Sequence, residues 1–514
     1  MIVITNKVSK VSLVKLKQEL DPYLRPVAGK LGEAENDHSK LLNEAGRLGA
    51  ILNGVAGTDI TTERELKTLI GKTIGISQGK DSGRVDREVL ASFILTHTNC
   101  VLRERKQGVD RGRNLLIYCY DEGVYIDGTA VLSRILAQIL NYAGGNIWSM
   151  GLESAVIALI QRKARIVDYE EFDLNFYAFE SSSLDLATLE LVDHDPRQLT
   201  TIKSHADPRK EATPSFDEFL RTTFDDDQDG KVTQAFVWSW LGYQLDRSTS
   251  AEAFLFLVSS GAGGKSSLLN VMRSVVGASN TTGQKLQALS GEFGLQPLLG
   301  KTALYSDESS SDVFPVEVVN AITTGSRVTI NIKNHAQLET KLRVKLTFAF
   351  NQLPPAATTI GFSRRLLLLP FPHVFLKQNA NKNLSKSLIA ETNGIAFKAI
   401  ESLRKLRASG YHFLESESMK DAKTEYLEGG LPQSLRYLKD RIKVNVGSRL
   451  KKSDVYPDFV AWCAQNGENS ATNQVFWVGA KKNWQTALHA MCQTSRVQGY
   501  DYLTDVDWRN EGAD

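Results

Sequence analysis

The segment FLFLVSSGAGGKSSLL at 254–269 constrains the fold more than any other part of the sequence. Its unbroken apolar run at 254–258 predicts a buried strand, and small residues then lead through Lys265-Ser266 to a helical pattern that begins at Leu268. A strand, a small-residue loop, Lys-Ser and a helix form a P-loop, in which backbone N–H groups converge on a phosphate at a helix N-terminus. The segment therefore predicts a nucleotide-binding site.

The residues of this loop have separate expected roles. Lys265 can reach the β- and γ-phosphates of ATP, and the Ser266 hydroxyl can hold Mg²⁺. One departure is visible, because Ser259 stands where the motif G-x-x-x-x-G-K-[ST] has its first glycine. The residues expected to bind the nucleotide are Ser260, Gly261, Ala262, Gly263, Gly264, Lys265, Ser266 and Ser267.

Length, charge and cysteine content limit the domain number, the nucleic-acid surface and the cellular compartment that are expected. The 514 residues exceed what one hydrophobic core holds, so about two to four domains are expected. A net charge of +2 means that any nucleic-acid surface must be local. The four cysteines include no C-x-x-C pair, which excludes a zinc ribbon and fits buried thiols in a reducing compartment. Without a long apolar run we expect neither signal peptide nor membrane span, and hence a cytoplasmic protein.

The first half of the chain offers acidic clusters that imitate metal sites. Asp121, Glu122 and Asp127 could belong to a two-metal primase or polymerase site, but turn and cap residues of a hairpin at 114–126 are the favoured interpretation. The segment Asp225–Gly230 copies the start of an EF-hand loop. Its twelfth position is Phe236 instead of a bidentate Glu, so calcium is not expected. Helices are expected at 11–24, 38–52, 87–98, 129–142, 152–162 and 234–245.

Two further strands carry polar residues at their ends. The strand 302–305 ends in Asp307-Glu308, which fits a Walker B element: Asp307 acts through Mg²⁺ and Glu308 polarises the attacking water. The strand 344–350 ends in Asn351, whose amide can sense the γ-phosphate or the water. These carboxylates and this amide are expected beside Lys265.

A pair of arginines and a hairpin favour a ring. Arg364 and Arg365 precede an apolar strand, and either can be an arginine finger that reaches the γ-phosphate of a neighbouring subunit. A surface salt bridge is the alternative. Between the strands, 328–343 predicts a β-hairpin with the tip Lys333, Asn334 and His335. In a ring this tip would hold a DNA backbone in the central channel; otherwise it is a solvent-exposed turn.

Taken in order, these motifs resemble those of a known family. They read SGAGGKSS, LYSDE, KNH, FAFNQLP and FSRRLLLLPF. The order resembles the superfamily III helicases, most closely the phage, plasmid and poxvirus primase-helicase branch, and the likeness spans about 114–375. It implies an AAA+ module, hexameric rings and 3′-to-5′ movement on DNA. The family usually has Gly at 259 and Asn at 263, where this chain has Ser and Gly. No primase constellation of paired Asp and His is present.

The C-terminal part resembles a small winged-helix domain. A helix follows Lys452, and 475–478 reads as a strand. DNA contact and protein docking are both open for its basic residues, which are Arg449, Lys451, Lys452, Lys481 and Lys482.

Together these features predict a multidomain α/β protein with a central AAA+ P-loop ATPase. The expected domains are a helical segment at 1–85, an α+β domain at 86–235, the ATPase at 236–376, a helical lid at 377–430 and a winged-helix-like domain at 431–514. The expected function is that of a ring-forming, ATP-dependent DNA helicase in the replication of a phage, plasmid or mobile element. Its expected partners are single-stranded and forked DNA, further copies of itself, origin DNA and a primase or other replication protein.

Two other classes of function compete with the helicase. An origin-binding initiator or scaffold would use ATP only as an assembly switch, and would recognise DNA through the C-terminal domain. A small-molecule kinase fits less well, because a long region precedes the P-loop and no acceptor site is visible.

Overall fold

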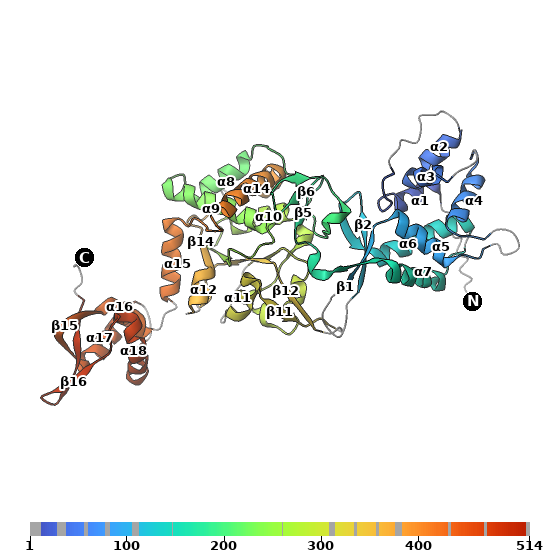
Figure 1. Ribbon diagram of the computed structural model, residues 1–514. Helices are drawn as coiled ribbons and strands as arrows, with labels where there is room; N and C mark the ends of the chain where they lie inside the picture. Colours follow the sequence, from blue (N-terminus) through green and yellow to red (C-terminus); the bar gives the residue numbers. More distant parts are fainter. Residues whose placement is uncertain are drawn as a thin grey trace, which may run out of the picture.

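A five-stranded parallel sheet holds the segment 254–258 at the centre of the computed structural model (Figure 1). A helical region lies at one end of the molecule and a small C-terminal domain at the other. The structure describes residues 12–27, 37–55, 60–77, 83–104, 113–145, 147–259, 261–307, 314–333, 337–355, 359–375, 383–429, 433–466 and 470–509. No helix within these ranges is long and apolar enough to cross a membrane.

The region before the central sheet begins with helices around one small sheet. Its elements are α1 (Leu13–Leu20), α2 (Asp37–Glu44), α3 (Gly46–Asn53), α4 (Glu63–Thr73), α5 (Arg87–His97), β1 (Cys100–Glu104), β2 (Asn114–Cys119), β3 (Val124–Asp127), α6 (Gly128–Gly144), α7 (Met150–Lys163) and β4 (Arg165–Asp168). The sheet order is β3-β2-β1-β4. One hydrophobic core runs from Leu13 to Ala164, so the boundary expected between 85 and 86 falls inside a continuous core.

The acidic residues of this region have structural roles. Asp127 accepts a hydrogen bond from the Ala130 N–H and caps α6, and Asp121 pairs with Arg47 at 3.0 Å. This confirms the interpretation as turn and cap residues. One helix prediction is wrong in detail, because the span 38–52 is divided into α2 and α3. Gly46 has φ +61° there, and this left-handed residue breaks the helix.

A second group of elements leads into the central sheet. It comprises β5 (Phe176–Ala178), β6 (Ser183–Asp185), β7 (Leu191–Val192), α8 (Pro214–Phe224) and α9 (Gln228–Leu245). The EF-hand-like segment is the start of α9, where the Asp227 carboxylate accepts a hydrogen bond from the Gly230 N–H at 2.6 Å. Trp240 is fully buried, as a core residue should be, and its Nε1 donates to Thr347 Oγ1 at 3.1 Å.

The central sheet has the order β14-β8-β13-β10-β9, with every neighbouring pair parallel. Its strands are β8 (Phe254–Val258), β9 (Thr281–Thr282), β10 (Ala303–Ser306), β13 (Lys345–Phe350) and β14 (Leu366–Pro370). Alternate residues of β8 serve two cores: Phe254 and Phe256 pack on one face, Leu255 and Leu257 on the other. Apolar side chains on both faces require helices on both faces.

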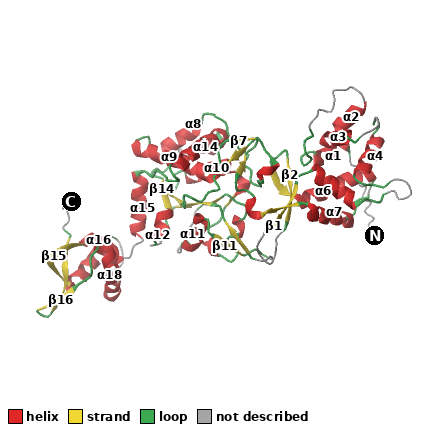
Figure 2. Ribbon diagram, in the orientation of Figure 1, coloured by secondary structure: helices red, strands yellow, loops and turns green. Residues whose placement is uncertain are grey.

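Helices cover the two faces, as Figure 2 shows. The remaining elements of this part are α10 (Lys265–Val276), α11 (Val316–Thr324), β11 (Arg327–Ile330), β12 (Leu338–Lys341), α12 (Ile360–Arg365), α13 (Leu384–Ala390), α14 (Thr392–Ala408) and α15 (Glu417–Gly429). The buried residues of α14 share a core with α9 and α10. The segment 377–430, expected to be a lid, thus includes a helix that packs firmly against the sheet layer.

Close packing of α14 on α9 depends on Gly242. A Cβ added there would lie 2.4 Å from the Ala399 carbonyl oxygen and 2.8 Å from the Leu403 nitrogen, both backbone atoms. We expect Gly242→Ala to lower the free energy of unfolding by about 1–3 kcal/mol, measured by chemical denaturation. Gly151→Ala in α7 is the matched control, since no atom lies within 4 Å of its added Cβ. Equal effects of the two changes would contradict this packing argument.

The C-terminal domain has its own core. Its elements are α16 (Gln433–Arg441), β15 (Ile442–Lys451), α17 (Lys452–Gln465), α18 (Asn473–Leu488), β16 (Thr494–Val497) and β17 (Tyr500–Trp508), and the antiparallel sheet order is β15-β17-β16. The strand expected at 475–478 is wrong, because these residues lie inside α18. Its buried side chains, Phe476, Ala480 and Trp484, recur every four residues, which is a helical period.

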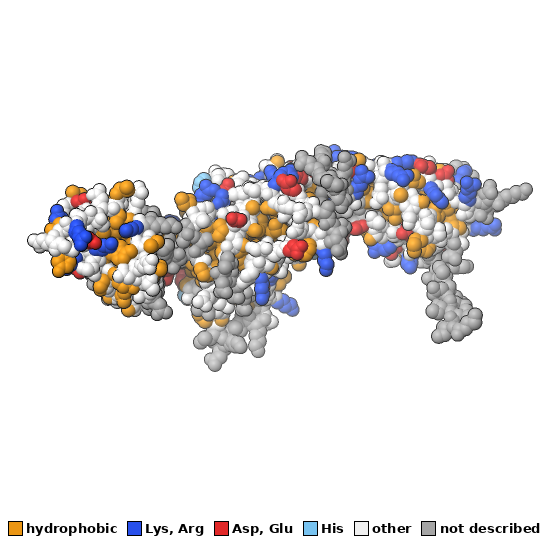
Figure 3. All heavy atoms as spheres, turned by 90° about the horizontal axis from the view of Figure 1, so that it is seen from below, with side chains coloured by type: hydrophobic (Ala, Val, Ile, Leu, Met, Phe, Trp, Pro, Cys, Tyr) orange, Lys and Arg blue, Asp and Glu red, His pale blue; other side chains and the backbone are white. Residues whose placement is uncertain are grey.

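Surface charge is spread along the molecule. On the face seen from below, Lys and Arg side chains are scattered among acidic and apolar ones (Figure 3). The cysteines form no disulfide, and Cys100, Cys119 and Cys463 are buried as expected.

Candidate functional site

The loop between β8 and α10 forms the candidate site. Gly264 caps the N-terminus of α10 with φ +98°, which a glycine adopts without strain. Ala262 has φ +48°, a left-handed conformation that costs a residue with a Cβ about 1–2 kcal/mol. Strain of this kind is typical of functional loops. Ser260, predicted to bind the nucleotide, lies outside the described residues.

Lys265 lies at the first position of α10 and its side chain is buried. Its Nζ donates hydrogen bonds to Asn351 Oδ1 at 2.9 Å, to the Ser259 carbonyl at 3.3 Å and to the Ser259 hydroxyl. The ammonium group is therefore held over the loop by residues that follow two neighbouring strands. Ser266, the next residue, is exposed.

Sheet register explains why Asn351 meets Lys265. Strands β8 and β13 are parallel neighbours with Val258 opposite Phe350, so the residues that follow them, Ser259 and Asn351, emerge side by side. The carboxyl edge of a parallel sheet is where ligands bind in such folds. The structure thus brings together the loop lysine and the amide expected to sense the γ-phosphate.

Asp307 follows β10 at the same edge of the sheet, one strand farther from β8. Its half-exposed carboxylate accepts a hydrogen bond from Arg273 Nη2 at 3.2 Å. Arg273 lies seven positions after Ser266, about two turns along α10 and on the same face. Glu308, expected to polarise the water, lies outside the described residues.

The residues present fit a magnesium ion bound together with a nucleotide. Mg²⁺ prefers oxygen ligands and usually takes one or two carboxylates along with substrate phosphates and water. The Asp307 carboxylate and the Ser266 hydroxyl supply such oxygens on exposed positions. Among the described residues no group of three or more His, Cys, Asp or Glu side chains could hold a metal without a nucleotide.

Arg364 and Arg365 lie at the amino ends of the parallel strands, opposite to the carboxyl ends where Lys265 lies. They end α12, directly before β14, and both donate to Glu252 Oε2, at 2.6 and 3.0 Å. Because β14 runs parallel to β8, residues before it lie roughly one strand length, about 15 Å, from the loop after β8. The side chain of Arg364 is 64% exposed and that of Arg365 is 12% exposed. Within one chain the arginines do not join Lys265.

The hairpin expected at 328–343 is present as β11 and β12, paired antiparallel. Lys333 at its tip is exposed, and its backbone N–H donates to Gln296 Oε1 at 3.3 Å. The other two tip residues predicted to contact DNA, Asn334 and His335, lie outside the described residues.

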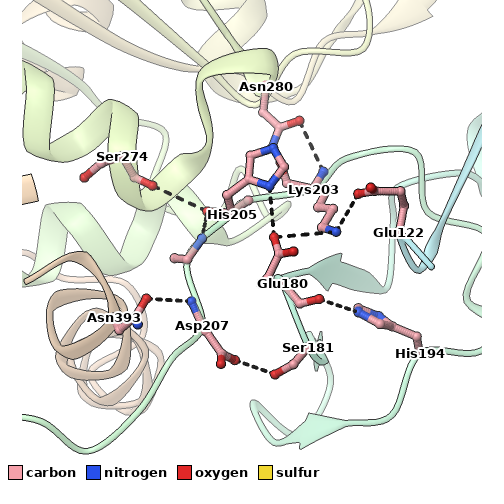
Figure 4. Close-up of polar contacts among 12 residues, drawn as sticks. Glu122, Glu180, Ser181, His194, Lys203, His205, Asp207, Ser274, Asn280 and Asn393 are labelled. Carbon is pink, nitrogen blue, oxygen red and sulfur yellow. Dashed lines mark hydrogen bonds and ion pairs between the residues drawn. The ribbon is translucent and has the colours of Figure 1, made fainter. Parts of the chain in front are cut away.

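The far end of α10 is tied to the region before the sheet (Figure 4). The Asn280 amide donates to the Val276 carbonyl at 2.8 Å and its oxygen accepts from the Lys203 N–H at 3.3 Å. The Lys203 ammonium pairs with Glu122 at 2.6 Å and with Glu180 at 3.6 Å. A hydrogen bond from His205 lowers the pKa of Glu180. These contacts join the C-terminal end of α10 to the preceding region.

Two residues of the site were not predicted. The motif presents Ser259 only as a departure, yet its hydroxyl accepts a hydrogen bond from Lys265 Nζ. Arg273 belongs to no sequence motif, although its spacing from Ser266 places it on the same face of α10, where it contacts Asp307 after β10.

The two positions that depart from the family motif, Ser259 and Gly263, lie against each other. A Cβ added to Gly263 would lie 3.0 Å from Ser259 Cβ and 3.1 Å from Phe371 Cβ, so a side chain at 259 leaves little room for one at 263. We expect Gly263→Asn alone to weaken binding of a fluorescent ATP analogue. Adding Ser259→Gly should restore it, with a coupling energy of about 1 kcal/mol. Strictly additive effects would show that the two positions are independent.

Comparisons with known proteins place the site within a shared segment. Residues 257–365 match the model of a family of unknown function (DUF5906), which includes every residue from Lys265 to Arg365 discussed above. Two apo structures of the NrS-1 C-terminal region (305–718) are similar in fold. The first has a TM-score of 0.50 and 12% sequence identity, and the match covers 84% of this chain and 100% of that chain. The second has a TM-score of 0.50 and 15% sequence identity, and the match covers 82% of this chain and 100% of that chain. No curated protein matches.

Proposed function

We propose that this chain is a ring-forming, ATP-dependent DNA helicase that translocates on single-stranded DNA during the replication of a phage, plasmid or mobile element. The hydrogen bond from Lys265 Nζ to Asn351 Oδ1 carries the proposal. It brings a phosphate-binding lysine and a sensing amide together at the carboxyl edge of a parallel sheet, where a nucleotide would bind.

The proposed reaction is hydrolysis of ATP. A water oxygen forms a bond to the γ-phosphorus, the bond to the oxygen bridging to the β-phosphate breaks, and Glu308 takes the proton from the water. Lys265 stabilises the negative charge on the phosphates, and Asn351 orients the water. Ser266 and Asp307 would hold Mg²⁺, which neutralises phosphate charge.

The positions of the arginines support a ring. Arg364 is exposed at the sheet edge opposite Lys265, so it can reach a γ-phosphate only on another copy of the chain. A contact between opposite edges of successive copies is head-to-tail, and such contacts form a ring when the rotation from copy to copy closes. Arg365, largely buried and bonded to the Gly361 carbonyl at 2.9 Å, would instead hold α12 in place.

The test is ATP hydrolysis by the wild-type chain with and without single-stranded DNA. We expect hydrolysis that DNA stimulates, since Lys333 at the exposed hairpin tip would couple the strand to the sheet edge. A chain that binds ATP but never hydrolyses it, with or without DNA, would contradict the proposal.

An initiator or scaffold remains the second candidate, favoured by the C-terminal domain. Its order of helix, strand, two helices and hairpin is that of a winged helix, and Lys451 Nζ lies 3.9 Å from the centre of the exposed Tyr500 ring on the hairpin. Cationic and aromatic side chains together suit nucleic acid. An initiator would lose origin binding when this domain is altered, but would not unwind a fork.

A further inference from the structure

A charged pocket lies at the sheet edge opposite Lys265, between the ATPase layer and the preceding region. It encloses about 490 Å³ of space, a figure that includes its open mouth. Segments just before β8, β10 and β13 line one wall, and β1 with residues 169–173 lines the other. Figure 1 shows β1 beside the hairpin β11–β12, so the pocket lies at the base of that hairpin.

The lining carries an excess of positive charge. Its two carboxylates, on Glu170 and Asp173, are already engaged: Glu170 pairs with Arg327 at 2.8 Å, and Asp173 accepts hydrogen bonds from the Thr201 N–H and hydroxyl at 2.5 and 2.7 Å. The cationic residues that line the pocket are Arg103, Arg247, Lys301, Lys341 and Arg343.

Three of these cations form no close ion pair among the described residues. Within the ranges that the structure describes, Arg103, Lys341 and Arg343 form no ion pair, and the buried Arg103 Nε has no hydrogen-bond partner. The Arg103 guanidinium is nevertheless held in place, 4.6 Å from the centre of the Tyr169 ring. Burial lowers the pKa of Arg343, so its charged form is destabilised and an incoming anion would relieve that cost.

Arg247 makes the pocket a preformed feature. Its Nε donates to the Asp173 carbonyl at 2.9 Å, and its Nη1 donates to the carbonyls of Arg343 at 3.2 Å and Lys301 at 3.4 Å. One guanidinium thus joins both walls. A rigid site loses less conformational entropy when it binds a ligand.

We propose that this pocket binds a phosphate group of a single-stranded nucleic-acid backbone. Guanidinium groups form paired hydrogen bonds with phosphate oxygens, and an unpaired Arg beside a second Arg and a Lys is suited to that anion. The pocket lies at the base of the hairpin whose exposed tip carries Lys333, so one strand can contact both. Binding here requires no ATP hydrolysis, and the site stands whether or not the chain is a motor.

The test uses the full chain with Lys341→Gln and Arg343→Gln combined. Its affinity for a labelled oligo-dT is measured at several salt concentrations. The double variant should bind about 10-fold more weakly, and the slope of log affinity against log salt should fall by about 0.7, as the loss of one phosphate contact predicts. Lys386→Gln with Lys405→Gln, two exposed lysines outside the pocket, is the matched control. Arg343→Lys should bind more tightly than Arg343→Gln, because it keeps the charge, but more weakly than the wild type, because it loses the paired hydrogen bonds.

A second arm identifies the source of the phosphate. In a Lys265→Ala background, a fluorescent ATP analogue reports any nucleotide bound outside the P-loop. If the double variant abolishes that binding and leaves oligo-dT affinity unchanged, the pocket holds a nucleotide and the nucleic-acid assignment is wrong. If neither ligand is affected while the thermal midpoint is unchanged, the pocket is no phosphate site. ATP hydrolysis without DNA should be the same in the double variant and the wild type, which separates this test from that of the helicase.

Discussion

Lys265→Ala is expected to lower the rate of ATP hydrolysis by about 10²-fold to 10³-fold. The Lys265 ammonium is buried and held by Ser259 and Asn351, so it is already oriented toward the place where the phosphates would lie. A prepositioned charge in a partly dry site stabilises the transition state without reorganisation. Phosphate release measured at saturating ATP checks this expectation.

The control is Lys285→Ala, an exposed lysine that follows β9. It removes the same charge from the same domain and should leave hydrolysis unchanged. If Lys265→Ala hydrolyses ATP at the wild-type rate, the loop is not the catalytic site and the proposed function is wrong.

Arg364→Ala is expected to lower hydrolysis by about 10³-fold or more while nucleotide binding persists. Its side chain lies at the edge of the sheet remote from Lys265, so its effect must be exerted on another copy of the chain. Arg365→Ala should mainly lower the thermal midpoint, because Arg365 is largely buried and bonds Gly361 and Glu252.

Mixing two inactive variants distinguishes a shared site from a local one. An Arg364→Ala chain still has Lys265, and a Lys265→Ala chain still has Arg364. Where these two meet, one interface has both residues, and random mixing makes about one quarter of the interfaces of this kind. Hydrolysis should therefore return on mixing. If the mixture stays inactive while both variants still form rings, Arg364 does not act across the interface.

The sequence was sufficient to predict the strand at 254–258, the helix that follows Lys265 and the strands beside them. An apolar run followed by small residues and Lys-Ser has few other physical interpretations, and Asn351 directly follows an equally apolar strand. That Asn351 contacts Lys265 depends on β13 lying next to β8, and the strand order arises from packing between distant segments.

Other features followed from packing that no local pattern reveals. The segment 475–478 is apolar and rich in valine, which favours a strand, yet Phe476 packs in register with Ala480 and Trp484 on one helical face. The core that joins Leu13 to Ala164 crosses the boundary expected at 85 because amphipathic helices bury their faces against whatever lies beside them.

The central claim is that ATP hydrolysis drives strand separation, and unwinding of a forked duplex tests it most directly. Wild-type chain with ATP and Mg²⁺ should displace the labelled strand, and Glu308→Gln should form rings and bind the fork without displacing it. A non-hydrolysable ATP analogue should likewise support binding alone. If wild-type rings bind ATP and the fork yet never displace the strand, the chain is not a helicase, and an ATP-switched initiator becomes the better account.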